Sequence, residues 1–191
     1  MGEKKAVRFA ARLMPQGIQI FQFRFSAGQT DISRPTAAVG LSVRASGAGL
    51  PVVFAQFFKD GSSSEIGVLR SLPGVRVLVC ERYFGRFRNI SEEARAEAVK
   101  AYGDILEEAL AAAGERGLLV LDEAVSACNH GVIREERLLD FLRHKPDELE
   151  VVLTGRNPSE ALLSAADYVT EMRKLRHPFD AGIPARKGVE F

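Results

Sequence analysis

The chain has 191 residues and a formal net charge of +1, with 26 basic and 25 acidic residues. Its length suits one domain with a sizeable core, and its 46% of hydrophobic residues excludes disorder as the main state. Because the charges nearly balance, a partner held by bulk electrostatics, such as duplex nucleic acid, is not expected. The two cysteines have no zinc-type spacing, which indicates a reducing cytoplasm and no disulfide framework.

The N-terminal segment MGEKKAVRFAARL is rich in charge and poor in consecutive apolar residues. It therefore does not fit a signal peptide. No stretch of the chain approaches the ~20 consecutive apolar residues of a membrane-spanning helix. We expect residues 1–17 to form an N-terminal arm and residues 18–191 to form a single α/β domain, without membrane or nucleic-acid partners.

Five apolar runs and a weaker sixth predict strands. Short, mostly continuous runs of Val, Leu and Ile suit strands that are buried on both faces of a sheet. In chain order, the runs lie at residues 18–25, 51–58, 75–81, 118–121 and 149–153, with the weaker one at 168–172.

Helical patterns lie between these runs. Pro35 is favourable in a first helical turn, and Ser91 is a good N-cap followed by two acids. The predicted helices span residues 35–48, 91–113, 134–144 and 158–166. Because strands and helices alternate, the sequence predicts a parallel sheet with helices on both faces. Ligands of such sheets bind beyond the carboxyl ends of the strands, so the loops after the strands are the candidate sites.

The loop at residues 26–36, after the first strand, stands where a phosphate-binding P-loop belongs. A P-loop reads G-x-x-x-x-G-K-[ST], because its amides close around phosphates and its lysine reaches them. Here Gly28 is the one glycine before the helix, and Arg34 stands near the lysine position. Pro35 supplies no N–H, and Thr36 keeps a hydroxyl one position late. The pattern is a weak indication of a phosphate site, and an ordinary strand-to-helix loop fits it equally well.

A Walker-B-like pattern ends the fourth strand, where LLVL runs into Asp122 and Glu123. In such a pattern the acid at the strand end binds Mg²⁺ directly or through water. The alternative is an acidic helix start, with carboxylates favoured by the helix dipole. After the fifth strand, Thr154, Gly155 and Arg156 place a cation at the same edge of the sheet.

Two further loops carry residues that suit ligand binding. Lys59 follows the second strand and either faces an anion or is solvated. The third strand runs into ERYFGRFR, with three aromatic residues and three arginines. Rings in loops often bind flat ligands or partners, and packing into the core is the alternative for one or two of them. We expect Cys128 to be a buried, inert thiol.

The C-terminal part of the chain resembles one known family. The motifs TGR, VTEM, HPFDAG and KGVEF lie in order after residue 153, and LLVLDE, SLPGV and TAAVGLSVRASGAGLPVVFAQFFKD lie upstream. These motifs are similar to those of P-loop-type corrinoid adenosyltransferases, which act on cob(I)alamin or cob(I)yrinic acid a,c-diamide. The resemblance implies a RecA-like α/β fold and a homodimer.

The resemblance also implies a reaction, in which the 5′-deoxyadenosyl group of ATP passes to the cobalt of a reduced Co(I) corrinoid and triphosphate leaves. The cobalt is the nucleophile, so no side chain is expected to act as one. The protein supplies positioning and charge stabilisation. ATP, Mg²⁺ and a corrinoid are the expected ligands, and a reduced flavoprotein is the expected electron donor.

The resemblance assigns roles to residues of this sequence in three groups. They are the ATP- and phosphate-binding residues Gly28, Arg34, Thr36, Thr154, Gly155 and Arg156, the Mg²⁺-binding residues Thr36, Asp122 and Glu123, and the corrinoid-facing residues Phe84 and Phe87. The chain departs from the family in its phosphate loop, where Gly-x-Gly-Lys-Gly-Lys-Thr-Thr is absent, and in its aromatic loop, which lacks tryptophan. An arginine can replace the lysine's charge but not the nest of amides. The alternative function is therefore a non-catalytic relative that binds a corrinoid or a partner protein without using ATP.

Overall fold

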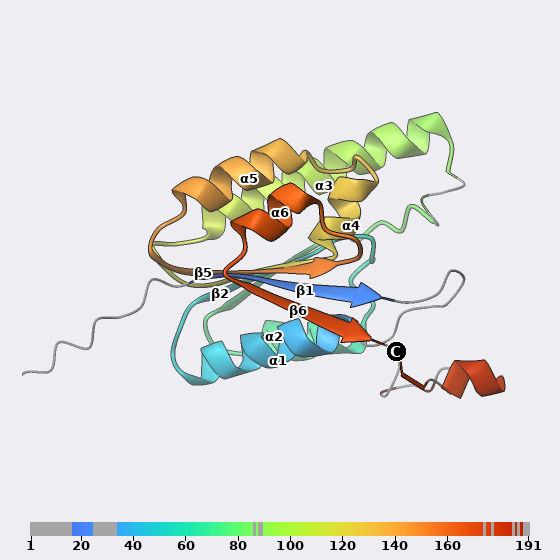
Figure 1. Ribbon diagram of the computed structural model, residues 1–191, viewed down its shortest axis with the longest axis horizontal. Helices are drawn as coiled ribbons and strands as arrows, with labels where there is room; N and C mark the ends of the chain where they lie inside the picture. Colours follow the sequence, from blue (N-terminus) through green and yellow to red (C-terminus); the bar gives the residue numbers. More distant parts are fainter. Residues whose placement is uncertain are drawn as a thin grey trace, which may run out of the picture.

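The computed structural model describes residues 17–24, 34–85, 87, 90–173, 175–176, 178–184, 186 and 188. They form three layers, with a six-stranded parallel sheet between two layers of helices (Figure 1). This arrangement confirms the α/β fold class and the parallel sheet that the alternation of strands and helices predicts. The predicted arm lies outside the described residues except for Gly17, and the division into an arm and a single domain stays a prediction.

All six predicted strands are present. They are β1 (Ile18–Arg24), β2 (Val52–Gln56), β3 (Val75–Val79), β4 (Arg116–Asp122), β5 (Glu148–Gly155) and β6 (Tyr168–Arg173). Their order across the sheet is β3-β2-β4-β5-β1-β6, and each neighbouring pair is parallel. β4 and β5 extend beyond their apolar runs, because charged and polar residues at their ends still pair in the ladder. Every residue of β2 is buried, as its continuous apolar run predicts.

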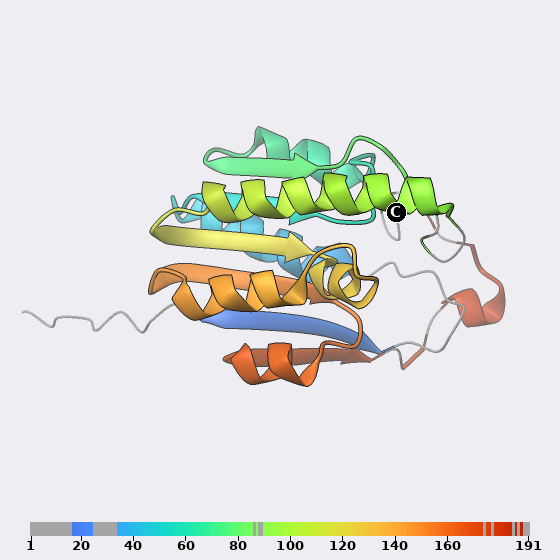
Figure 2. The same ribbon diagram turned by 90° about the horizontal axis from the view of Figure 1, so that it is seen from above.

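The helices lie on both faces of the sheet. They are α1 (Arg34–Gly47), α2 (Ser64–Ser71), α3 (Glu92–Ala112), α4 (Ala124–Asn129), α5 (Glu135–His144) and α6 (Glu160–Ala165), followed by the 3₁₀ helix η1 (Pro178–Ala181). In Figures 1 and 2, α1 and α2 cover one face, and α3, α4, α5 and α6 cover the other. Across the described ranges, no helix has both the length and the apolar character needed to cross a membrane.

The predicted helices correspond to α1, α3, α5 and α6. Ser91 caps α3 as predicted, since its side chain accepts a hydrogen bond from the Ala94 N–H. The sequence did not predict α2, because this short helix contains Gly67 and shows a weak apolar pattern. Its Ile66 and Leu69 are buried against the sheet, so packing rather than propensity stabilises it.

Apolar side chains fill both spaces between the sheet and the helices. On the side of α3, α4, α5 and α6, the core includes Leu119, Leu121 and Leu153 from the central strands. On the side of α1 and α2, it includes Phe54 and Val120. Because β2, β4 and β5 are packed on both faces, the polar residues at their carboxyl ends stand on a rigid support.

Candidate functional site

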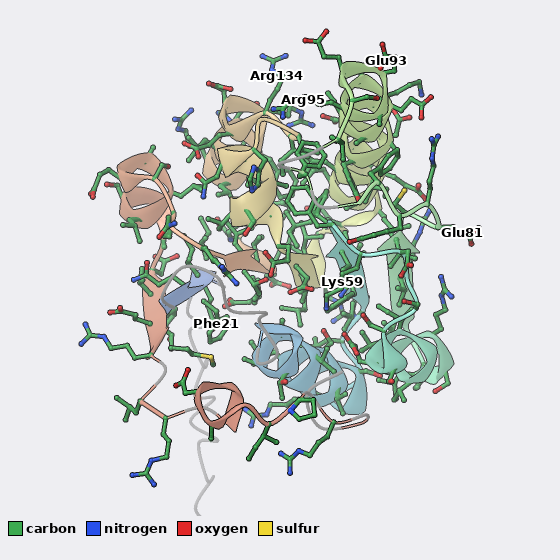
Figure 3. The ribbon with its side chains drawn as sticks, turned by 90° about the vertical axis from the view of Figure 1, so that its right-hand side faces the viewer. Phe21, Lys59, Glu81, Glu93, Arg95 and Arg134 are labelled. Carbon is green, nitrogen blue, oxygen red and sulfur yellow. The ribbon has the colours of Figure 1, made fainter. Side chains whose placement is uncertain are left out.

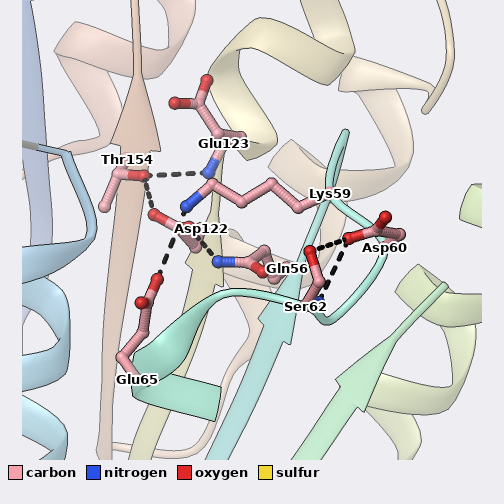
Figure 4. A network of polar contacts seen from close by, with 8 residues as sticks. All are labelled: Gln56, Lys59, Asp60, Ser62, Glu65, Asp122, Glu123 and Thr154. Carbon is pink, nitrogen blue, oxygen red and sulfur yellow. Dashed lines mark hydrogen bonds and ion pairs between the residues drawn. The ribbon is translucent and has the colours of Figure 1, made fainter. Parts of the chain in front are cut away.

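Polar side chains meet where β2, β4 and β5 end. Figure 3 looks onto this edge of the sheet. The strand register pairs Gln56 with Asp122 and places Thr154 directly after the last β4–β5 pair. Thr154 Oγ1 donates to Asp122 Oδ1 over 2.7 Å, and Gln56 Nε2 donates to Asp122 Oδ2 over 3.0 Å (Figure 4). All three residues are fully buried, so the Asp122 carboxylate is held in one orientation.

The environment of Asp122 disfavours its charged form. Burial and the neighbouring carboxylate of Glu123 raise the pKa of Asp122, while Lys59 and the two hydrogen bonds lower it less strongly. A carboxylate in such a place gains from a bound cation, which offsets the repulsion from its neighbour. This electrostatic arrangement is typical of a cation site.

Glu123 has a backbone conformation that residues other than glycine rarely adopt, with φ 63° and ψ 16°. Such left-handed residues cost roughly 1–3 kcal/mol and cluster at functional sites. The Glu123 N–H donates to Thr154 Oγ1 over 2.8 Å, which ties the turn to β5. α4 begins at the next residue, but the Glu123 side chain makes no capping hydrogen bond. Helix capping therefore does not account for this carboxylate.

Gly155 allows α4 to pack closely on the end of β5. Its φ is +145°, and a Cβ atom there would lie 2.7 Å from Val125 Cβ and 2.8 Å from Ser126 N. Both distances are too short for a side chain, and the obstacle includes backbone. The glycine of the TGR motif is therefore required by the contact between β5 and α4.

Two side chains of α4 hold the loop that follows β5. Ser126 Oγ accepts a hydrogen bond from the Arg156 N–H over 3.3 Å. Asn129 Nδ2 donates to the carbonyl oxygens of Arg156 and Asn157 over 2.7 and 3.0 Å. Sequence reasoning missed Ser126 and Asn129, because their spacing on a short helix is a signal only once the strand order is known. The acidic turn and the TGR turn thus form one unit.

The residues of the predicted phosphate loop fall mainly outside the described part of the chain. Gly28 lies outside it. Arg34 is the first residue of α1, and Thr36 is exposed in the first turn of that helix. α1 has no acid in its first turn and starts at the carboxyl edge of the sheet (Figure 1). The structure brings Asp122, Glu123, Thr154 and Gly155 together, whereas the phosphate and Mg²⁺ roles of Gly28, Arg34 and Thr36 stay predictions.

The two predicted corrinoid-facing residues join a cluster of aromatic rings. Phe84 and Phe87 are half-buried and pack against the main core. The Phe84 ring centroid lies 5.7 Å from that of Tyr102, and the Phe87 centroid lies 5.3 Å from Phe58 and 5.8 Å from His130. Core packing, which was the alternative for these residues, thus accounts for the buried part of each ring. Their contact with a corrinoid stays a prediction. Sequence reasoning missed Phe58 and His130.

An arginine lies over each of these two rings. The Arg82 guanidinium carbon is 5.0 Å from the Phe84 centroid, and that of Arg95 is 5.1 Å from the Phe87 centroid. Arg95 also donates to the carbonyl oxygen of His130 over 2.6 Å. Cation–π contacts of this kind contribute about 0.5–1 kcal/mol at exposed sites and so favour these ring positions.

The oxygen atoms of this edge fit Mg²⁺ that is held largely by its nucleotide. Within the described ranges, no group of three or more His, Cys, Asp or Glu side chains is placed to hold a metal ion. Mg²⁺ commonly binds one or two carboxylates together with water and phosphate oxygens, and Asp122 and Glu123 offer two carboxylates. Gln56 Oε1 is buried without a hydrogen-bond partner, so it can accept from metal-bound water.

Two other features lie apart from this chemistry. A cavity of about 450 Å³ lies at the amino edge of the sheet, where Gly17, Arg44 and Glu150 are among its lining residues. Cys128 is half-buried rather than buried as the sequence predicted. Its partial burial, together with two nearby carboxylates, raises its pKa to about 12. That thiol is protonated at neutral pH, as expected of an inert cysteine.

The parallel sheet, with an acidic pair at the end of a central strand, is consistent with a P-loop NTPase-like domain. A sequence model of the family ATP:corrinoid adenosyltransferase BtuR/CobO/CobP matches residues 27–191. The chain belongs to this family, which confirms the resemblance seen in its motifs.

Individual relatives agree with the family match. The corrinoid adenosyltransferase of Pseudomonas aeruginosa is 36% identical over 165 residues, which cover 83% of this chain and 78% of that protein. The corrinoid adenosyltransferase of a Sinorhizobium species is 32% identical over 206 residues, with 100% and 89% covered. That of Escherichia coli K12 is 28% identical over 191 residues, with 99% and 93% covered. These relatives support a transferase.

Proposed function

We propose that this chain transfers the 5′-deoxyadenosyl group of ATP to the cobalt of a reduced corrinoid at the carboxyl edge of β2, β4 and β5. The observation that carries the proposal is the buried Asp122, held by Thr154 and Gln56 beside Glu123, in a chain of this family. The relatives support catalysis and give no support to the non-catalytic alternative.

In this reaction, the electron pair of Co(I) forms the bond to C5′ of ATP, and the bond between C5′ and its oxygen breaks. The electron pair of the broken bond leaves with triphosphate. Because the corrinoid supplies the nucleophile, the protein's contribution is to align cobalt, C5′ and the leaving oxygen and to stabilise the departing charge. The proposed mechanism therefore needs no nucleophilic side chain.

The acidic edge orients the nucleotide in this proposal. Asp122 and Glu123 are the carboxylates that would hold Mg²⁺, and bound Mg²⁺ would neutralise part of the charge on the triphosphate. Thr154 fixes Asp122 through one hydrogen bond and fixes the Glu123 turn through another. Gly155 and Arg156 place the TGR turn beside them, where Arg156 would contact the nucleotide.

The start of α1 is the second part of the proposed ATP site. Gly28, Arg34 and Thr36 would contact the phosphates there, with Thr36 also near Mg²⁺. The positive end of the α1 dipole and the lack of an acid in its first turn support an anion at this place.

The aromatic cluster is the proposed corrinoid side of the site. Phe84 and Phe87 would face the flat ring system, with Arg82 and Arg95 fixing their positions. The family resemblance is the basis for two further proposals, a homodimer and a reduced flavoprotein as the electron donor, and the cysteine usage is the basis for a third, a cytoplasmic location. The two cysteines, which are both free, are compatible with that location.

An anaerobic assay tests the proposal. The purified protein receives chemically reduced cob(I)alamin, Mg²⁺ and ATP, and the absorption spectrum follows the loss of Co(I) and the appearance of adenosylcobalamin. We expect turnover that requires ATP, and an Asp122→Asn variant that is at least about 100-fold slower, since even the partners of metal ligands change activity by about 10–100-fold. Asp104→Asn is the matched control, because Asp104 is exposed on α3 and pairs with Lys100. Corrinoid binding without ATP-dependent turnover would instead support the non-catalytic alternative.

A further inference from the structure

The side chain of Lys59 lies across the acidic edge instead of extending into solvent. Its Nζ atom is 3.5 Å from Glu65 Oε1, and the two side chains are 32% and 23% exposed. Figure 3 places Lys59 near the centre of the edge, between the two helix layers, and Figure 4 shows it reaching towards Asp122 and Thr154. Its charge acts on Asp122, where it opposes the effect of burial on the pKa. The alternative that Lys59 is simply solvated therefore holds only in part.

The neighbours of Lys59 on both sides hold its backbone in place. Phe58 has a left-handed backbone with φ 60°, and its ring packs against those of Tyr102 and His130 at 5.6 Å each. On the other side, Asp60 accepts a hydrogen bond from the Ser62 N–H over 3.1 Å, which closes the turn into α2. Such backbone strain persists only where the surrounding contacts hold it, and it clusters at functional sites.

The charges around Lys59 suit an exchange of partners. Glu65 pairs with its ammonium group, Asp122 is close enough to interact with its charge, and Glu123 follows Asp122 in the same turn. Glu65 Oε1 is buried and has no hydrogen-bond partner. Its ion pair with Lys59 therefore compensates poorly for the water that this oxygen loses on burial. A cation bound at Asp122 and Glu123 would weaken their attraction for Lys59, and phosphates on that cation would bring acceptor oxygens to the same edge.

We propose that Lys59 binds the triphosphate of ATP, in place of the lysine that the loop at residues 26–36 lacks. This inference rests on the proposed function, because it names a further substrate-binding residue of the same site. On binding, the Lys59 ammonium exchanges its ion pair with Glu65 for hydrogen bonds to phosphate oxygens. Its charge then stabilises the triphosphate as the bond between C5′ and oxygen breaks.

Calorimetric titrations of four proteins test this proposal with three probes: Mg²⁺–ATP, Mg²⁺–triphosphate and adenosine. The proteins are the wild type, Lys59→Met, Lys59→Arg and the matched control Lys100→Met, whose lysine is exposed on α3. We expect Lys59→Met to weaken ATP and triphosphate binding about tenfold or more and to leave adenosine binding unchanged. Lys59→Arg should retain most of the affinity, and Lys100→Met should match the wild type. Triphosphate binding by Lys59→Met that equals the wild type, or no triphosphate binding by the wild type, overturns the proposal.

Glu65→Gln separates a phosphate role from a purely structural ion pair. If Lys59 binds phosphate, removing the competing carboxylate keeps or tightens triphosphate binding. If the ion pair only stabilises the fold, Glu65→Gln and Lys59→Met weaken binding alike, which overturns the proposal. This variant also keeps the proposal testable if Lys59→Met does not fold.

The transfer assay on the wild type distinguishes a failure of this proposal from a failure of the proposed function. Triphosphate binding that depends on Lys59, in a protein that forms no adenosylcorrinoid, supports the Lys59 proposal while the proposed function fails. Normal transfer by Lys59→Met with unchanged triphosphate affinity overturns the Lys59 proposal and leaves the proposed function intact.

Discussion

Replacing Gly155 with alanine tests how closely α4 packs on β5. The new Cβ would lie 2.7 Å from Val125 Cβ, 2.8 Å from Ser126 N and 3.1 Å from Ser126 Oγ. Overpacking of this kind costs about 1–3 kcal/mol. A side chain at φ +145° adds about 1–2 kcal/mol of backbone strain. We therefore expect Gly155→Ala to lower the free energy of unfolding by about 2–5 kcal/mol, out of the roughly 5–15 kcal/mol typical of a domain.

Urea denaturation followed by far-ultraviolet circular dichroism measures this loss, and is suitable because the chain has no tryptophan for fluorescence. Gly103→Ala is the matched control. Gly103 lies inside α3, and a Cβ there would meet nothing within 4 Å, so we expect a gain of about 0.5–1 kcal/mol from reduced backbone entropy. A Gly155→Ala protein within about 0.5 kcal/mol of the wild type would refute the close packing, and with it the rigid geometry of the acidic turn.

The other predictions concern Asp122, Ser91 and Cys128. Burial and Glu123 raise the pKa of Asp122 in the folded protein, so the free energy of unfolding falls as the pH rises from the unfolded value near 4 through the raised folded value. Asp122→Asn removes this loss of stability, and Gln56 Oε1 can accept a hydrogen bond from the new amide. The variant should therefore unfold at a higher urea concentration than the wild type at about pH 7. The difference between the two proteins should shrink at about pH 3. Ser91→Ala should lower the free energy of unfolding by about 1 kcal/mol in the same titration, through loss of the α3 cap, and an unchanged midpoint would contradict the cap. Cys128, with its pKa raised to about 12, should react with iodoacetamide in the native protein far more slowly than a free thiol does, and equal rates would contradict the raised pKa.

The fold was largely predictable because the apolar runs, the helical patterns and the helix caps all indicate the same elements. The continuous apolar run of β2 predicts a strand buried on both faces, and every residue of β2 is buried. The cap at Ser91 marks the start of α3 within one residue. The helix α2 was not predictable, because the intrinsic helix propensity of its eight residues is not what stabilises it. Its stability comes from the packing of Ile66 and Leu69 on the sheet.

The candidate site was predictable only in part. An acidic pair after an apolar run marks the proposed Mg²⁺ edge in the sequence itself. The partners of that pair are far away in sequence, since Gln56 is 66 residues and Thr154 is 32 residues from Asp122. Such pairings follow from the strand order, which a single sequence does not determine. The direction of the Lys59 side chain likewise depends on its ion pair with Glu65 of α2.

The most direct test of the central claim is the anaerobic alkylation of cob(I)alamin by this protein, with and without ATP. Our account predicts that, with Mg²⁺ and ATP, the Co(I) spectrum gives way to that of adenosylcobalamin and triphosphate is released in equal amount. It also predicts no such change when ATP is left out. Failure to form adenosylcobalamin at millimolar ATP, by protein that is folded and binds the corrinoid, would contradict the account.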